Sequence, residues 1–216
     1  MIAKWRNIIQ KRPFEHYPDK YENWFSENEF AYLSELIAVK RMLPLETKGI
    51  EIGVGSGRFA EPLNIKLGID PSQKMIELAV KKGINVIKGI AEELSLKNDI
   101  FDFALMVTTI CFLDDIESTL REVYRILKPS GCFIVGFVDK DSIIGKLYQA
   151  HKNESLFYKE ARFFSVNEVL KYLKKQGFHD FEYIQTIFQP LNEIRNIQEV
   201  KKGYGEGSFI VIRAEK

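Results

Sequence analysis

The chain has 216 residues, of which 45% are hydrophobic and 28% are charged, and its formal net charge is +1. This composition is typical of a globular protein, and the neutral balance gives no global field toward nucleic acid or an anionic membrane. No apolar run approaches the ~18 residues of a membrane span, and the first twenty residues lack the apolar core of a signal peptide. We therefore expect one cytoplasmic domain that binds neither nucleic acid nor a membrane.

Both cysteines, Cys111 and Cys132, lie inside apolar runs, and the histidines are scattered along the chain. Because the sequence contains no CxxC pair, this pattern favours buried free thiols over a disulfide or a metal site. We expect no metal.

The N-terminal part is expected to be irregular and aromatic-rich over residues 1–25 and helical after that. Ser26 and Glu29 have the spacing of a capping box, which predicts a helix reaching about Leu43. The expected apolar stripe of this helix consists of Phe30, Leu33 and Ile37.

Strand-like and helix-like segments then alternate. Strands are predicted at residues 49–54, 66–70, 84–89, 101–109, 132–138, 181–188 and 207–214. Ser72 and Asp115 are expected to cap helices, and Ser165 with Glu168 forms a second capping box. Pro129 is expected to end the helix that Asp115 begins. Alternation of this kind predicts an α/β fold with a parallel sheet, and we expect the last strand to return antiparallel.

A glycine turn follows the first strand. Gly53, Gly55 and Gly57 alternate there, and Asp70 ends the second strand. Ligands of open parallel sheets bind outside the carboxyl ends of the strands, where glycine lets the backbone approach a ligand closely. A carboxylate at the next strand end can accept two hydrogen bonds from a ribose diol. The pattern predicts a pocket for an adenosine-containing cofactor.

Two classes of cofactor compete for this pocket. The dinucleotide fingerprint is GxGxxG/A, but Arg58 stands at its third small position and the third glycine comes one residue early. Pro62 also interrupts the segment that would form the helix after the turn. An NAD(P)-dependent oxidoreductase therefore stays as the weaker alternative.

The segment EIGVGSG at residues 51–57 resembles motif I of class I S-adenosylmethionine-dependent methyltransferases, whose usual form is [DE]xGxGxG. LGIDPSQKMIELA and REVYRILKPSGCFIVGF resemble later segments of the same family, and the likeness covers roughly residues 22–216. Within the family, the chain is similar to small methyltransferases of the ubiquinone/menaquinone-biosynthesis type.

The resemblance implies a Rossmann-like, doubly wound, mostly parallel sheet of seven strands with an antiparallel last strand. It also implies a single domain of three parts. These are an N-terminal helical lid at 1–45, a cofactor-binding half at 46–140 and a substrate-side part at 141–216.

The resemblance further assigns site residues. Glu51 would order the glycine loop and approach the methionine ammonium, and Asp70 would hold the ribose hydroxyls. The other cofactor contacts would come from Gly53, Gly55, Gly57, Pro71, Met75, Ala91, Glu92 and Thr108. Core packing is the alternative for Met75, and Glu92 could instead be an ordinary first-turn acid. Acceptor contacts are expected from Tyr17, Tyr21, Trp24, Tyr158 and Arg162.

The chemistry implied is methyl transfer from S-adenosyl-L-methionine to a small molecule by in-line displacement, leaving S-adenosyl-L-homocysteine. No residue stands out as a general base, so the catalytic residues are unassigned. Residues 108–111 read TTIC where amino-methylating nucleic-acid enzymes often carry [DN]PP[FY], which argues against a nucleic-acid substrate. A module that binds the cofactor without turnover is the other alternative, and the chain is expected to be a monomer or a homodimer.

Overall fold

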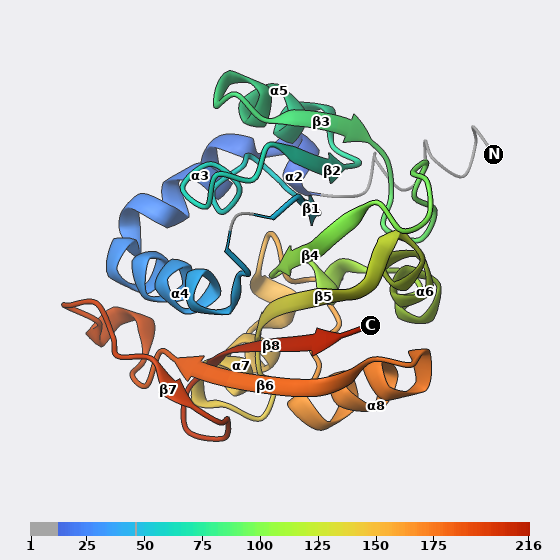
Figure 1. The fold of residues 1–216 in the computed structure, drawn as a ribbon. Coiled ribbons are helices and arrows are strands. Elements are labelled where there is room, and N and C mark those ends of the chain that lie inside the picture. The colour runs from blue at the N-terminus through green and yellow to red at the C-terminus, as the bar shows by residue number, and fades with distance from the viewer. Residues whose placement is uncertain (1–12, 46) are drawn as a thin grey trace.

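The computed structural model describes residues 13–45 and 47–216, and their strands form an eight-stranded sheet of order β3-β2-β1-β4-β5-β8-β6-β7 (Figure 1). The strands are β1 Gly49–Ile52, β2 Leu67–Asp70, β3 Asn85–Lys88, β4 Phe101–Val107, β5 Leu127–Val138, β6 His179–Thr186, β7 Lys201–Lys202 and β8 Phe209–Glu215. Strands β1 to β5 pair in parallel. The two-residue β7 is an edge strand beyond the seven that were predicted.

The last strand runs antiparallel, as predicted. β8 lies between β5 and β6 and is antiparallel to both, so β6 has the same direction as the first five strands. The mostly parallel α/β fold class is confirmed.

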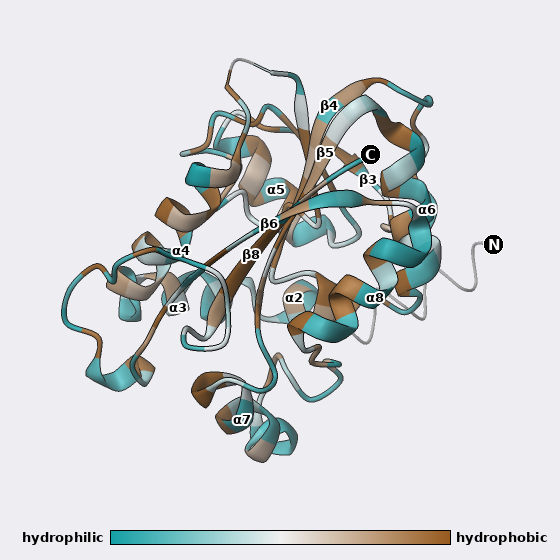
Figure 2. Cartoon of the chain, turned by 60° about the horizontal axis from the view of Figure 1, so that its bottom comes forward, coloured by the Kyte–Doolittle hydropathy of each residue, from teal (hydrophilic) through white to brown (hydrophobic). Residues whose placement is uncertain are grey.

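Both faces of the sheet are buried. In β4, Ala104 and Met106 pack into one core while Phe103 and Leu105 pack into the other, because successive side chains of a strand point to opposite faces. The first face is covered by α6 (Ile116–Ile126) and α8 (Val166–Gln176), and the second by α3 (Pro18–Glu27) and α4 (Glu29–Met42). Figure 2 shows the hydrophobic strands between these two groups of helices. This explains why the central strands are apolar nearly throughout.

Three helices start at the side-chain caps that the sequence predicts. Ser72 accepts a hydrogen bond from the first turn of α5 (Gln73–Lys81), and Asp115 does the same for α6. Ser165 and Glu168 form both hydrogen bonds of a capping box at the start of α8.

The N-terminal segment differs from its prediction. It is helical, with α2 at Pro13–His16 followed by α3. Each helix begins with a proline, whose fixed φ suits the first helical position. Residues 1–12 of the expected irregular segment and of the expected lid lie outside the described residues.

The start of α4 is also corrected. The helix begins at Glu29, and its N-cap is Asn28, because Ser26 is still inside α3 and cannot take the extended conformation of a cap. Asn28 makes no side-chain cap and donates instead to the Trp24 carbonyl at 3.0 Å.

The expected apolar stripe is not the buried face of α4. Phe30 is 40% exposed, and Leu33 and Ile37 are only partly buried. The buried residues are Ala31, Ser34, Glu35, Ala38, Val39 and Met42. Most of these side chains are small, so the helix can lie close to the sheet.

Two differences lie further along the chain. α6 ends at Ile126, before Pro129, because Leu127 already pairs with β4 as the first residue of β5. The weakly periodic residues 140–162 include α7 (Ile143–Ala150), which Ser142 caps. Over the described ranges, no helix is both long and apolar enough to cross a bilayer.

Candidate active site

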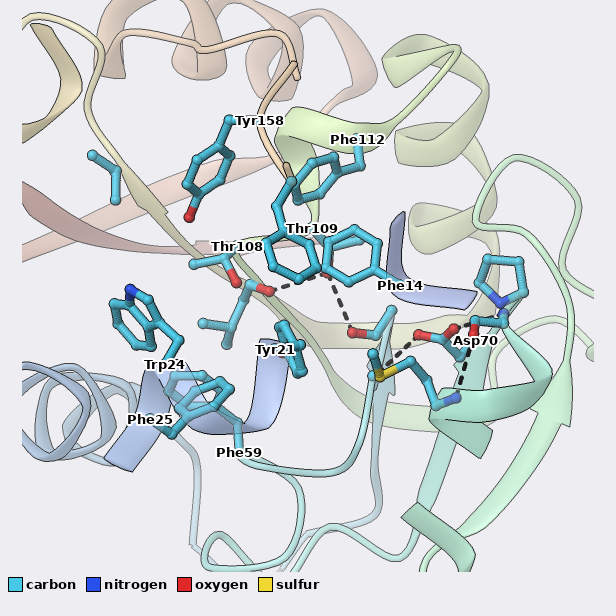
Figure 3. A pocket seen from close by; sticks show the side chains of 18 of the residues that line it. Phe14, Tyr21, Trp24, Phe25, Phe59, Asp70, Thr108, Thr109, Phe112 and Tyr158 are labelled. Atoms are coloured by element: carbon cyan, nitrogen blue, oxygen red, sulfur yellow. Dashed lines mark hydrogen bonds between the residues drawn. The ribbon is translucent and has the colours of Figure 1, made fainter. Parts of the chain in front are cut away.

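The carboxyl ends of β1, β2 and β4 surround a cavity (Figure 3). Gly53 and Gly55 follow β1, Asp70 ends β2, and Thr108 follows β4; all four residues line the cavity. The order of the strands reverses beside β1, and this is the place where open α/β sheets bind ligands. The fold therefore brings the glycine turn and the acid together, as the sequence predicts.

The glycine turn folds back over the end of β2. The Gly53 amide donates to the Ile69 carbonyl at 2.8 Å. The φ angles of Gly53, Gly55 and Gly57 are +74°, +53° and +82°. Residues other than glycine rarely adopt these values. A Cβ at Gly53 would also lie 2.4 Å from the side chain of Thr109. Backbone conformation thus accounts for all three glycines.

The segment that follows the turn forms no helix. Residues 53–66 consist of turns and extended chain, consistent with the interruption predicted at Pro62. In dinucleotide sites the pyrophosphate rests on the N-terminus of a helix at this place. Its absence from residues 53–66 further weakens the oxidoreductase alternative.

The backbone of two loops fixes the carboxylate of Asp70. Oδ2 accepts from the Gly55 amide at 2.8 Å, Oδ1 accepts from the Ser72 amide at 2.8 Å, and the residue is 7% exposed. Because a carboxylate offers about four acceptor positions, these two bonds are compatible with accepting a ribose diol.

Glu51 lies in β1 just before the turn, is 2% exposed, and is not among the residues that line the main cavity. The Ala60 amide donates to its carboxyl group, but Oε2 has no hydrogen-bond partner among the residues described. Burial, with a smaller contribution from Asp70, raises the pKa of Glu51 well above its ordinary value. A buried acid with an unpaired oxygen is suited to binding a cation.

A smaller hollow shares Gly53 and Pro71 with the main cavity and is also lined by Ala91 and Glu92. The predicted adenine contacts therefore lie next to the predicted ribose contact. Glu92 also has a structural role, since its Oε1 accepts from the Asp114 amide at 2.9 Å.

Other predicted cofactor residues differ in their placement. Met75 lines the main cavity and is almost fully buried. Thr108 lines it with a φ of +49°, a rare conformation for a β-branched residue. Gly57 is not among the lining residues; a Cβ there would lie 2.3 Å from Ile84. The third glycine therefore allows the turn to pack against its own domain.

The predicted acceptor residues are only partly brought together. Tyr21, Trp24 and Tyr158 line the cavity, and Figure 3 shows Trp24 and Tyr158 on the side away from Asp70. Tyr17 and Arg162 are exposed and do not line it. The Arg162 guanidinium lies over the ring of Phe164, 4.8 Å from its centroid.

Sequence reasoning missed much of the cavity wall. The lining residues that were not assigned to the site are Phe14, Glu15, Phe25, Glu35, Phe59, Ser72, Val107, Thr109, Phe112, Val138, Tyr148 and Phe157. Tyr21 and Phe25 are four residues apart, which would place them on one face of a helix, but no helix was predicted there. Glu35 could not be found in this way, because the predicted apolar stripe of α4 is not the face that the helix buries.

Glu22 fastens α3 to the glycine turn. Its carboxylate accepts hydrogen bonds from the Ser56 hydroxyl and, at 2.6 Å, from Arg58 Nη2. Although burial acts to raise it, the bonds from Arg58 and Ser56 hold the pKa of Glu22 below its ordinary value. The arginine that departs from the dinucleotide fingerprint thus connects the turn to the covering helix.

Glu22→Ala is expected to lower the free energy of unfolding by about 1–3 kcal/mol, because the variant loses hydrogen bonds to a charged acceptor. S-adenosylhomocysteine, if bound beneath α3, should also dissociate faster. Denaturant unfolding and stopped-flow dissociation measure the two effects. Wild-type stability from this contact should be present above the ordinary glutamate pKa and lost as the pH falls through the lowered value.

Glu27→Ala is the matched control, since Glu27 lies on the same helix and is exposed. Equal dissociation rates for the Glu22 and Glu27 variants would contradict the role of Glu22.

Fold and site together define an α/β domain with a cavity at the carboxyl ends of its parallel strands, and comparison with known proteins gives its family. A model of the methyltransferase domain matches residues 50–135. A Thermotoga maritima structure, described as a SAM-dependent methyltransferase and possible histamine N-methyltransferase, is 55% identical, with a TM-score of 0.93 over 94% of this chain and 98% of that one. The chain belongs to the class I S-adenosylmethionine-dependent methyltransferases.

Curated relatives extend the family beyond Thermotoga. An uncharacterized protein of Methanocaldococcus jannaschii is 45% identical over 94% of this chain and 98% of its own length. An uncharacterized protein of Mycobacterium tuberculosis is 31% identical over 76% of this chain, which spans 59% of that protein.

Proposed function

We propose that the protein transfers the methyl group of S-adenosylmethionine to a small-molecule acceptor by in-line displacement. The observation that carries the proposal is that one cavity extends from Asp70 and the glycine turn to an aromatic compartment under α2 and α3 (Figure 3). We use this name for the part of the cavity lined by Phe14, Tyr21, Trp24, Phe25, Tyr148 and Tyr158. The first region fits the nucleoside end of the cofactor, and the second can hold an acceptor next to it.

The cofactor contacts follow from the geometry around the turn. We assign the ribose diol to Asp70, and the methionine ammonium to the unpaired Oε2 atom of Glu51. Gly53 and Gly55 would leave space for the methionine chain beside the turn, and Ala91 and Glu92 would lie at the adenine.

When bound, the cofactor supplies a methyl group on a sulfonium sulfur: the acceptor lone pair forms the new bond to carbon while the electron pair of the broken S–C bond returns to sulfur. The residues of the chain orient the partners and exclude water. Orientation of this kind can supply roughly 7–11 kcal/mol. The aromatic side chains of α2 and α3 that line the cavity would surround the reacting atoms with apolar walls.

A small acceptor is supported by the enclosure of the aromatic compartment and by the description of the Thermotoga relative as a possible histamine N-methyltransferase. A module that binds the cofactor without turnover is the alternative. Only a measurement of catalysis distinguishes such a module from an enzyme.

Two measurements test the proposal. S-adenosylmethionine and S-adenosylhomocysteine at about 100 times Kd should stabilise the protein by about 2.7 kcal/mol, whereas NADH should give no shift in melting temperature. S-adenosylhomocysteine should then accumulate with at least one member of a panel of amines, phenols and thiols. A shift in melting temperature with NADH alone would contradict the assignment of S-adenosylmethionine as the cofactor. Cofactor binding without turnover on any acceptor would favour the binding module.

A further inference from the structure

We propose that Glu35 recognises the acceptor, and that the acceptor is a small amine that carries a positive charge in water. The inference rests on the proposed methyltransferase function, because it concerns the aromatic compartment of the same cavity. It names the chemical class of the acceptor. It also gives a role to Glu35, which had none in the sequence analysis.

Glu35 is a buried carboxyl group that faces the cavity. The residue is 6% exposed and lines the cavity from the buried face of α4. Among the residues that the structure describes, no group donates a hydrogen bond to this carboxyl and no cation pairs with it; burial alone shifts its pKa. Burying an acid without a partner is costly, so this position is explained best by a ligand that supplies the partner.

The charges that line the cavity are all of one sign. The described lining contains the carboxyl groups of Glu15, Glu35 and Asp70 and no lysine, arginine or histidine. Glu15 and Asp70 both bind Ser72 at the nucleoside end, which leaves Glu35 to the aromatic compartment. A cavity of this kind selects cations and rejects anionic acceptors.

Aromatic rings line the same cavity as the acid. Tyr148 and Tyr158 stack with their centroids 4.7 Å apart, and Trp24 and Phe25 line the same cavity. The pKa of each tyrosine is raised, chiefly by burial and also by Glu35, so the phenols stay neutral and lie near the carboxyl. Ring faces around a single negative charge form a cage for an organic ammonium ion.

The acid also provides for the proton that an ammonium must lose. Burial raises the pKa of Glu35 to about 8, and an ammonium nearby favours its ionised form. Glu35 can then take the proton as an N–H bond breaks and its electron pair stays on nitrogen. That pair forms the N–CH3 bond as the S–C bond breaks, and Glu35 releases its proton to water when the methylated ammonium leaves.

Calorimetry on the protein saturated with S-adenosylhomocysteine tests the inference without turnover. The probes are 2-phenylethylamine, histamine and the uncharged 2-phenylethanol, each titrated at pH 7 in two buffers of different ionisation enthalpy. We expect at least one amine to bind about tenfold or more tightly than the alcohol and to release close to one proton. Glu35→Gln should lose both the preference and the proton release, while alcohol binding stays the same.

Two other variants make the result specific. Glu29→Gln changes an exposed acid on the same helix and should behave as wild type. Trp24→Leu should weaken amine binding while leaving proton release intact. Because this variant keeps Glu35, it still tests the inference if the Glu35 variant folds poorly.

Some results would overturn the inference. Amine affinity unchanged in Glu35→Gln, alcohol binding as tight as amine binding, or no binding of either amine would each do so while leaving the proposed function in place. Failure of S-adenosylhomocysteine itself to bind would overturn the proposed function as well.

Discussion

Asp70→Ala is expected to weaken binding of S-adenosylhomocysteine by about 10²–10⁴-fold, the effect of losing two hydrogen bonds to a charged acceptor at about 1.5–3 kcal/mol each. The carboxylate also accepts from the Gly55 and Ser72 amides, so the variant loses one of the contacts that join the glycine turn to β2. Isothermal titration measures the affinity.

Two further variants, Asp70→Asn and Asp102→Ala, distinguish the loss of ribose binding from a general loss of folding. The amide of asparagine keeps one acceptor oxygen and should give an intermediate loss. Asp102 pairs with Lys128 at 2.7 Å. It lies near the start of β4, at the end of the strand opposite to the cavity, so the Asp102→Ala variant should bind S-adenosylhomocysteine as the wild type does. Wild-type affinity in Asp70→Ala would refute the assigned role.

Glu35→Gln is expected to be more stable than the wild-type protein at alkaline pH and equal to it at acid pH. The folded protein holds the proton of Glu35 up to about pH 8, whereas the unfolded chain releases it near 4.5. Between these values the unfolded state binds fewer protons, so wild-type stability falls as the pH rises, by at most about 1.4 kcal/mol per pH unit. The stability that Glu35 contributes is complete below 4.5 and lost above 8.

Urea unfolding of both proteins from pH 4.5 to 9, without ligand, measures this difference. Other buried acids such as Glu51 titrate in both proteins and cancel in the comparison. Tyr148 and Tyr158 have pKa values raised by burial and stay neutral across the range. Parallel stability curves for variant and wild type would show that Glu35 is ionised in the folded state at neutral pH.

Local signals in the sequence were sufficient for most of the sheet and for the placement of Asp70 beside the glycine turn. Asp70 and the glycine turn could be found because each follows a strand directly, and parallel strands end at a common edge. The caps of α5, α6 and α8 were readable because a side chain bonds to its own helix. These features depend on neighbours in sequence.

The acceptor end depended on contacts between distant segments. Phe14, Phe112 and Phe157 meet in space, with ring centroids 5.0 and 5.3 Å from that of Phe14, although no local pattern links them. Glu35 became visible only once α4 was seen to bury its small residues and not Phe30. Cytoplasmic location and oligomeric state remain predictions.

A crystal structure of the protein with S-adenosylhomocysteine would show the cofactor contacts directly. We expect both ribose hydroxyls on the carboxylate of Asp70, the amino group of the homocysteine part at Glu51 Oε2, and the sulfur facing the aromatic compartment. A nucleoside bound elsewhere, or a ribose that does not contact Asp70, would contradict this expectation.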